Sequence, residues 1–290
     1  MKICRFNDDR LGIVVGDLVH DVTDLQTEIR SSSPYAMLGD AVVAALPQWR
    51  ARLAARARQV PGIPLADVAL LAPVARPSKV MAAPTNYADH IAEMAAARIA
   101  GGSKHTAKIG SDGIFLKANS AMVGAAAGVP VRFPERRTDH EAELVVVIGK
   151  QGSDIDQAHA LDFVAGYCLG LDMTIRGPED RSFRKSPDGY AVLGPFMVTA
   201  DELPDPDNVS FALSVNGQVQ QNSNTKHLVY GIRRLIEFAS SFYTVYPGDV
   251  YYTGTPAGVG PVRPGDVITV EASAIGRMDV RVRAHEIRSH

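Results

Sequence analysis

The sequence predicts an α+β protein in which strands predominate and a small N-terminal domain precedes a larger, strand-rich region. Short apolar segments bounded by turn residues recur from residue 143 towards the C-terminus, which is typical of strands. Only a few segments show helical spacing. Four prolines between residues 61 and 77 separate the N-terminal helical segment from the strand-rich remainder. A chain of 290 residues can form one large domain with a smaller one attached.

The N-terminal part combines short strands with one helix. Residues 1 to about 30 are predicted to form short strands, with turns at Asp8-Asp9 and Gly16-Asp17. Apolar residues recur near helical spacing between residues 41 and 59, and the arginines among them would form a solvated face. We place the domain boundary near residue 75, so that residues 1–75 form the small domain and residues 76–290 the larger, strand-rich domain.

The remainder is mostly strand-like, with one further helix predicted over residues 227–242. A strong hairpin signal, Asn216-Gly217, joins two polar-apolar alternating segments. The predicted strands cover residues 143–149, 163–171, 209–216, 250–253 and 267–270.

Composition and charge exclude several classes of protein. Apolar residues make up 46% and charged residues 21% of the chain, which are globular values. A net charge of −2 argues against a nucleic-acid partner. The longest apolar stretch, residues 121–131, is too short and too interrupted for a membrane span. Two distant cysteines and no apolar leader favour a cytoplasmic location.

Three carboxylates form the most informative pattern in the chain. Glu141 and Glu143 lie in DHEAELVVVIG, which reads as a strand, and side chains at i and i+2 of a strand point to one face. Neighbouring carboxylates repel each other unless a cation or a proton separates them. Asp172, at the end of the strand-like YCLGLD, would add a third ligand. Oxygen-only ligands suit Mg²⁺, Mn²⁺ or Ca²⁺, and a solvated strand face is the alternative.

A second pattern, PTNYADHIAEM, predicts a helix that Asn86 can cap. His90 and Glu93 then occupy neighbouring positions on one helical face. A carboxylate beside an imidazole orients the ring and supports its protonated form, which makes the histidine a better base. A surface ion pair is the alternative unless this helix closes over a metal site.

A third pattern, YYTGTPAGVG at residues 251–260, predicts a strand followed by a glycine-rich turn. Such a loop offers backbone N–H groups and the Thr255 hydroxyl to an anionic oxygen, although a tight structural turn is the alternative. Lys117, Arg176 and Lys185 are further candidates for anion binding, and each is otherwise a surface cation.

Taken in order, the motifs resemble the fumarylacetoacetate hydrolase superfamily. They are NYxxHxxEM, FLKxxSxxVG, HExELxxVIG, LDMTxR, a lysine (Lys185) and then a separate Gly-Pro (Gly194-Pro195), and PGDxxxTGTPxGVG. The match covers about residues 78 to 284, most of the chain. It implies the family's mixed β-roll catalytic domain, a smaller N-terminal domain and a homodimer.

The resemblance also implies roles by position. Glu141, Glu143 and Asp172 match the ligands of a divalent metal, Mg²⁺ or Mn²⁺, with Ca²⁺ a further candidate. His90, Glu93 and Lys185 match catalytic positions, with the first two on a helix that closes as a lid. Positions expected to bind the substrate are Tyr87, Lys117, Arg176, Gly254 and Thr255.

The implied reaction is hydrolysis of a C–C bond in a 2,4-dioxo acid of the acylpyruvate type, in aromatic or sugar-acid catabolism. His90, held by Glu93, takes a proton from water, which attacks the distal carbonyl, and the metal and Lys185 stabilise the enolate. The same site can serve an isomerase of the 2-hydroxyhepta-2,4-diene-1,7-dioate type or a decarboxylase acting on a substrate such as oxaloacetate. An inactive binding protein is the third alternative, against which the retained carboxylates and dyad argue.

Two features depart from the family pattern. Twenty residues, 95–114, separate the dyad helix from the FLK motif, a longer segment than is usual. We expect this extension, which includes His105, to be a mobile lid. Glu179 stands where some acylpyruvate-cleaving members carry glutamine, so their substrate specificity does not transfer directly.

Overall fold

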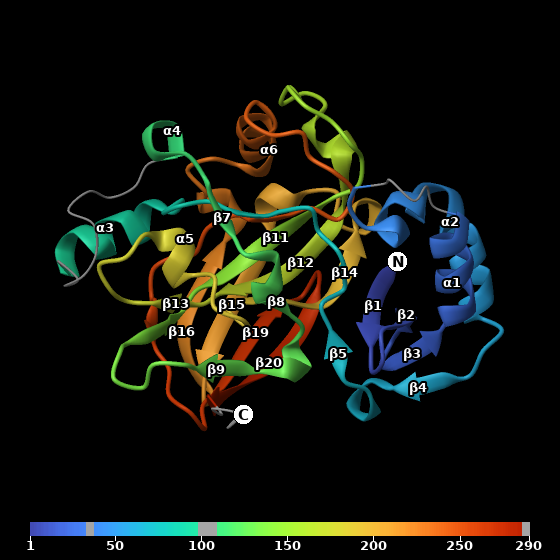
Figure 1. The fold of residues 1–290 in the computed structure, drawn as a ribbon, viewed down its shortest axis with the longest axis horizontal. Helices are drawn as coiled ribbons and strands as arrows, with labels where there is room; N and C mark the ends of the chain where they lie inside the picture. The colour runs from blue at the N-terminus through green and yellow to red at the C-terminus, as the bar shows by residue number, and fades with distance from the viewer. Residues whose placement is uncertain (33–37, 98–108, 286–290) are drawn as a thin grey trace, which may run out of the picture.

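A computed structural model describes residues 1–32, 38–97 and 109–285. Within them the chain builds sheets of twelve, five and three strands, which confirms the predicted α+β, strand-rich class. Helices α1 and α2 cover strands β1–β3 at one end of the molecule (Figure 1). The N-terminal elements are β1 (Lys2–Phe6), β2 (Arg10–Val15), β3 (Leu18–Asp21), α1 (Thr23–Ser32), α2 (Ala41–Ala57), β4 (Gly62–Pro64) and β5 (Leu70–Leu71).

The remaining elements build the part of the molecule that carries the predicted site. Its α-helices, among the residues that the structure describes, are α3 (Ala88–Ala97), α4 (Ile109–Asp112), α5 (Arg181–Arg184) and α6 (Ile232–Ser240). The strands are β6 (Val80–Ala82), β7 (Phe115–Lys117), β8 (Met122–Val123), β9 (Val129–Val131), β10 (Thr138–His140), β11 (Ala142–Ile148), β12 (Val164–Asp172), β13 (Thr174–Ile175), β14 (Ala191–Thr199), β15 (Ser210–Val215), β16 (Gln218–Asn224), β17 (Val250–Tyr252), β18 (Gly260–Pro261), β19 (Val267–Ala272) and β20 (Gly276–Ala284).

The twelve-stranded sheet joins both ends of the chain. Its order is β4-β3-β2-β1-β14-β12-β11-β17-β6-β7, with β5 paired to β1 and β8 to β14. Strand β1 pairs antiparallel with β14, with Lys2 opposite Val198. The core beneath this junction mixes Ile3 and Leu11 with Leu193 and Met197. A domain boundary near residue 75 therefore stays a prediction, because sheet and core continue across it.

Local sequence signals account for several elements. Helix α2 begins after Asp40, whose Oδ1 accepts hydrogen bonds from Val42 N at 3.0 Å and Val43 N at 3.2 Å. The predicted hairpin at Asn216-Gly217 joins β15 to β16, with positive φ at both turn residues. This five-stranded sheet continues from β15 through β19, β20 and β9. Met278 and Val280 lie on the buried face of β20.

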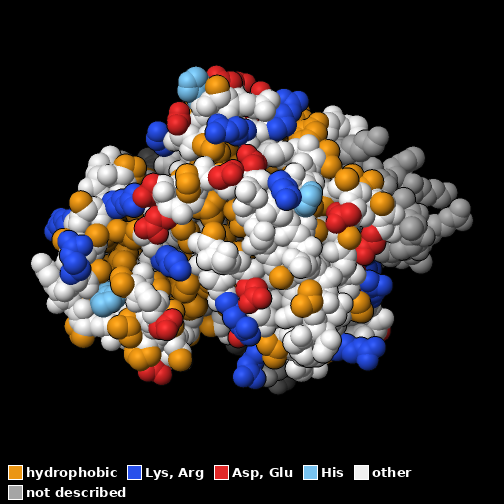
Figure 2. All heavy atoms as spheres, turned by 180° about the vertical axis from the view of Figure 1, so that it is seen from behind, with side chains coloured by type: hydrophobic (Ala, Val, Ile, Leu, Met, Phe, Trp, Pro, Cys, Tyr) orange, Lys and Arg blue, Asp and Glu red, His pale blue; other side chains and the backbone are white. Residues whose placement is uncertain are grey.

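The surface carries charges of both signs. Basic and acidic side chains are interspersed over the rear face, in keeping with the small net charge of −2 (Figure 2). Within the described residues, every helix is too short or too polar to cross a membrane.

Candidate metal centre and active site

The three predicted metal ligands meet where β11 and β12 run side by side. Glu143 belongs to β11, Asp172 ends β12, and Glu141 lies between β10 and β11, where its carbonyl accepts a hydrogen bond from Asp172 N at 2.9 Å. One carboxylate oxygen from each residue lies within 4.8 Å of the others. All three side chains are buried. Antiparallel pairing thus brings together residues 29 to 31 positions apart in the chain.

The surroundings of Glu143 fit a cation. Among the described residues, its carboxylate accepts one hydrogen bond, from Gly254 N to Oε2 at 2.5 Å. Burial and the nearby Asp172 charge raise the pKa of Glu143 well above its usual value. A divalent cation would remove this conflict, and three hard oxygen donors are the ligand set that Mg²⁺ or Mn²⁺ prefers. The residues present therefore fit the metal that the sequence pattern predicts.

Two lysines contact the carboxylates. Lys185 Nζ donates to Glu141 Oε2 at 2.5 Å and to Asp172 Oδ2 at 2.7 Å. Lys117 Nζ contacts Asp172 Oδ1 and donates to the Tyr190 carbonyl at 2.8 Å. Burial would raise the pKa of Glu141, but Lys185 and Arg176 hold it down at about 2. Burial lowers the pKa of Lys117, whereas two carboxylates outweigh burial and raise that of Lys185.

Arg176 is held by two carboxylates rather than left free. Its Nε donates to Asp139 Oδ2 at 2.7 Å and its Nη2 to Glu141 Oε1 at 3.0 Å. Asp139, which the sequence analysis missed, is fully buried and also accepts from Arg137 Nε at 2.6 Å. Its position two residues before Glu141 continues the Asp-x-Glu-x-Glu alternation, which was the available signal.

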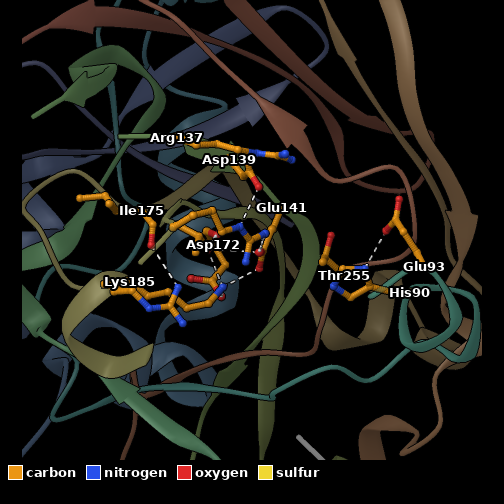
Figure 3. Close-up of polar contacts among 12 residues, drawn as sticks. His90, Glu93, Arg137, Asp139, Glu141, Asp172, Ile175, Lys185 and Thr255 are labelled. Atoms are coloured by element: carbon orange, nitrogen blue, oxygen red, sulfur yellow. Dashed lines mark hydrogen bonds and ion pairs between the residues drawn. The ribbon is translucent and has the colours of Figure 1, made fainter. Parts of the chain in front are cut away.

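The predicted dyad lies on α3, facing the carboxylates. His90 Nδ1 donates to Glu93 Oε2 at 2.9 Å, and Glu93 Oε1 accepts from Gly258 N at 3.0 Å. His90 is buried, whereas Glu93 is half-buried. Figure 3 shows His90 and Glu93 opposite Glu141 and Asp172, with Thr255 on the side of His90.

The role expected for Asn86 as a helix cap is wrong. Its side chain instead accepts from Tyr230 N at 2.8 Å and donates to the carbonyls of Tyr230 and Thr253 at 3.0 and 2.8 Å. This buried amide therefore ties the start of α3 to two loops. The neighbouring Tyr87 is fully buried, and its hydroxyl has no hydrogen-bond partner among the described residues. Its predicted contact with substrate stays a prediction.

The loop after β17 packs against both the dyad and the carboxylates. Gly254 has φ +107°, and a Cβ there would lie 2.7 Å from Asn86 Cβ, so conformation and packing both require glycine. Thr255 is buried and its Oγ1 accepts a hydrogen bond from Gln221 Nε2 at 2.8 Å. Gln221 was not predicted, because a single glutamine in a hairpin strand carries no sequence signal for a site.

The structure describes one of the two departures from the family pattern, Glu179, but only the ends of the other, the segment 95–114. Glu179 pairs with Arg136 through both carboxylate oxygens, at 2.9 and 2.7 Å, and this pairing lowers its pKa. Its carboxylate is therefore neutralised by a neighbour. The lid expected over residues 95–114 falls largely on 98–108, including His105, which lie outside the described residues.

Comparison with known proteins decides the family. The fumarylacetoacetate (FAA) hydrolase C-terminal family matches residues 79–283. The chain is also 50% identical over 287 residues to a maleylpyruvate hydrolase of Aquipseudomonas alcaligenes, covering 98% of this chain and 100% of that one. This chain belongs to the fumarylacetoacetate hydrolase family. The resemblance inferred from the motifs is thereby confirmed.

Solved structures of this fumarylacetoacetate hydrolase family extend the likeness to the fold. Maleylpyruvate hydrolase from Sphingobium sp. SYK-6, in complex with manganese(II) and pyruvate, has a TM-score of 0.82 and 35% identity over 99% of this chain and 100% of that one. A 5-carboxymethyl-2-hydroxymuconate delta-isomerase from Mycobacterium smegmatis has a TM-score of 0.72 and 31% identity, with 99% and 100% coverage. Both hydrolases and isomerases therefore share this architecture.

Proposed function

We propose that this protein is a metal-dependent hydrolase that cleaves a C–C bond in an acylpyruvate of the maleylpyruvate type, in aromatic catabolism. The observation that carries the proposal is the convergence of three buried carboxylates, within 4.8 Å of one another, opposite a His90–Glu93 pair. The 50% identity to a maleylpyruvate hydrolase along almost the whole chain supports the choice of reaction.

Binding draws on the cations around the carboxylates. A divalent cation held by Glu141, Glu143 and Asp172 supplies Lewis-acid polarisation of a 2-oxo acid when bound. Arg176 reaches Glu141 through one nitrogen only, so we propose that it turns this nitrogen to a substrate carboxylate while Asp139 keeps hold of Nε. The Thr255 hydroxyl lies across the site from Asp139 and Glu141, on the side of His90 (Figure 3).

His90 acts as the general base. An ionised Glu93 can only accept hydrogen bonds, so the Nδ1 that contacts it carries the proton. The other ring nitrogen, Nε2, is then free to take a proton from water. Gly258 N holds the second oxygen of Glu93, which keeps the dyad in one orientation. Activated water adds to the distal carbonyl carbon.

Cleavage follows from the tetrahedral adduct. The bond between C3 and C4 breaks, and its electron pair passes to the pyruvate fragment as an enolate, while C4 leaves as a carboxylic acid. The enolate then takes a proton at C3 to give pyruvate. Lys185, buried among Glu141, Asp172 and Thr174, adds positive charge close to the developing anion.

An isomerase is the second candidate function. The isomerase from Mycobacterium smegmatis covers this chain from end to end at 31% identity, and an enolate is common to both reactions. Isomerisation moves a proton without adding water. The two functions therefore differ in whether pyruvate and a second acid are released.

An absorbance assay tests the proposal. Purified protein, stripped with EDTA and resupplied with Mg²⁺ or Mn²⁺, is mixed with maleylpyruvate, acetylpyruvate, oxaloacetate or a 2-hydroxymuconate-type diene acid. We expect the diketone absorbance to fall and pyruvate to form only when metal is present. Turnover of the diene acid alone would replace the hydrolase by the isomerase, and inactivity on all four would reject both.

Three finer assignments belong to the same proposal. We propose Mg²⁺ or Mn²⁺ as the metal, and relative kcat values with each ion decide between them. A cytoplasmic location is supported by Cys4 and Cys168, which are buried free thiols. A homodimer rests on the family resemblance and is tested by light scattering, where a mass of one chain, 31.1 kDa, would contradict it.

A further inference from the structure

Gln221 is a buried polar residue that nothing in the reaction scheme uses. It lies on β16, in the five-stranded sheet, and only 1% of its surface is exposed. Its side chain nevertheless reaches out of that sheet to two parts of the site. Oε1 accepts from Ala142 N at 3.0 Å, between Glu141 and Glu143, and Nε2 donates to Thr255 Oγ1 at 2.8 Å and to the Pro256 carbonyl at 2.9 Å.

The orientation of this amide is determined by its partners. A backbone N–H can only donate, so the atom facing Ala142 N must be the side-chain oxygen. A backbone carbonyl can only accept, so the atom facing Pro256 O must be the amide nitrogen. Two independent neighbours thus give the same assignment, and the Thr255 hydroxyl faces an N–H group that cannot accept.

This geometry limits what the Thr255 hydroxyl can do. A threonine hydroxyl has one proton and two lone pairs. One lone pair is occupied by Gln221 Nε2, which cannot take the proton in return. The proton is therefore free for another acceptor. Among the described residues this proton has no hydrogen-bond acceptor, and Thr255 is buried beside Gly254, whose N–H group donates to Glu143 in the carboxylate site.

We propose that Gln221 is a positioning residue that makes Thr255 a hydrogen-bond donor to an anionic oxygen of the substrate. The inference rests on the proposed function, because it needs a 2-oxo acid in the site. It assigns to Gln221 a task that bracing of the loop alone does not require: the choice of which way a hydroxyl proton points.

Two variants of similar size separate these roles. Gln221→Glu keeps an acceptor for Ala142 N, but its second oxygen would accept the Thr255 proton and turn it away from the substrate. Gln221→Met removes the polar contacts but leaves that proton free. If Gln221 acts only as a brace, Glu should be tolerated better than Met. If it orients the proton, Met should be tolerated better than Glu.

The test is steady-state kinetics on the metal-loaded enzyme with the acylpyruvate substrate. A lost hydrogen bond to a charged group should raise KM for Gln221→Glu by on the order of 10- to 100-fold with kcat little changed. Gln221→Met should change KM by less. In a Thr255→Val background, Gln221→Glu should add little, since the hydroxyl is already absent. A larger effect for Met, or effects that multiply with Thr255→Val, would overturn the inference.

A measurement on the unaltered protein covers the case in which Gln221→Glu does not fold. In a neutron structure of the deuterated holoenzyme with pyruvate bound, the Thr255 deuterium should point at a pyruvate oxygen. A deuterium directed to any protein acceptor would overturn the inference. An unaltered enzyme without activity on acylpyruvates would instead reject the proposed function, so the two failures are distinct.

Discussion

Glu143 is the residue whose surroundings depend most on a cation. It is 1% exposed, it lies beside Asp172, and burial followed by that neighbouring charge raises its pKa well above 4.5. Glu141 differs, because Lys185 and Arg176 lower its pKa to about 2. The pKa values of these two carboxyl groups, which are separated by one residue in the chain, are thus shifted in opposite directions. The metal-free site therefore carries a conflict that is concentrated at Glu143.

Glu143→Gln should stabilise the metal-free protein at neutral pH. A carboxyl group whose pKa is raised in the folded protein stabilises the folded state fully at pH values below 4.5. This contribution is lost as the pH rises through the pKa of the folded state. The variant avoids that loss, so its Tm in EDTA should exceed that of the unaltered protein by on the order of a few degrees at pH 7 and equal it near pH 4.5. Thermal unfolding across this range checks it. Exposed Glu135→Gln is the control, and a constant difference across pH would contradict the account.

His90→Ala should reduce acylpyruvate hydrolysis by roughly 10²- to 10⁴-fold, because the variant lacks the imidazole that we propose takes the proton from water. Where the unaltered protein also decarboxylates oxaloacetate, which needs no activated water, that activity should persist in the variant. His159→Ala is a matched control, since His159 also pairs with a carboxylate three residues away, Asp156, but lies exposed. Pyruvate release from both substrates checks the prediction, and hydrolysis at the original rate would refute the assignment of His90.

At the scale of elements, the loop after β17 should tolerate little change. Gly254→Ala places a Cβ 2.7 Å from Asn86 Cβ at a φ of +107° and would shift the N–H group that holds Glu143. We expect a loss of about 1–3 kcal/mol in stability and a marked loss of activity. Gly265→Ala is the control, because Gly265 has φ +101° but no neighbour within 4 Å. Denaturant unfolding and kcat/KM for both variants check this, and equal activities would contradict it.

Several elements with local signals were predicted, whereas most of those formed by tertiary contacts were not. The expectation that strands continue to about residue 30 was wrong, because Thr23–Ser32 form helix α1, which buries Leu25 and Ile29. The Asn216-Gly217 hairpin follows from turn geometry alone. Helix α6 begins at Ile232, five residues later than predicted, because Asn86 binds both backbone groups of Tyr230 and Leu228 bridges to Tyr87. Strand β14 was missed because nine consecutive buried residues show no alternation.

The residues of the candidate site also differ in whether a short-range sequence pattern reveals them. Glu141 and Glu143 follow from strand alternation, and His90 and Glu93 from helical spacing, so each pair is visible in a short segment. Their meeting with Asp172 required antiparallel pairing of β11 and β12, which the family motifs supplied. Gln221 comes from a separate sheet, 79 residues from Ala142, and no short-range pattern could reveal it.

At the scale of the whole molecule, one sheet crosses the predicted domain boundary. Strand β1 pairs with β14, and β14 pairs with β12, which ends in Asp172. The carboxylate site and the N-terminal strands therefore share one continuous hydrogen-bonded network. Helices α1 and α2 lie on the N-terminal end of this sheet (Figure 1). We infer that the two regions depend on each other for stability.

The metal-free protein should accordingly unfold in one cooperative transition. Separating the regions would leave β14 without β1 and expose the shared core around Ile3 and Met197. Calorimetry checks this through equal calorimetric and van't Hoff enthalpies. Two resolved transitions, with residues 1–75 unfolding on their own, would contradict the account and favour an independent domain.

The central claim is that Glu141, Glu143 and Asp172 form one divalent-metal site. Equilibrium dialysis against Mn²⁺ tests it most directly, with Glu143→Gln compared to the exposed control Glu135→Gln. The account predicts one Mn²⁺ per chain for the unaltered protein and the control, and binding at least 10-fold weaker for Glu143→Gln, as follows from the loss of a charged ligand. Undiminished binding by Glu143→Gln, or no Mn²⁺ bound by the unaltered protein, would contradict it.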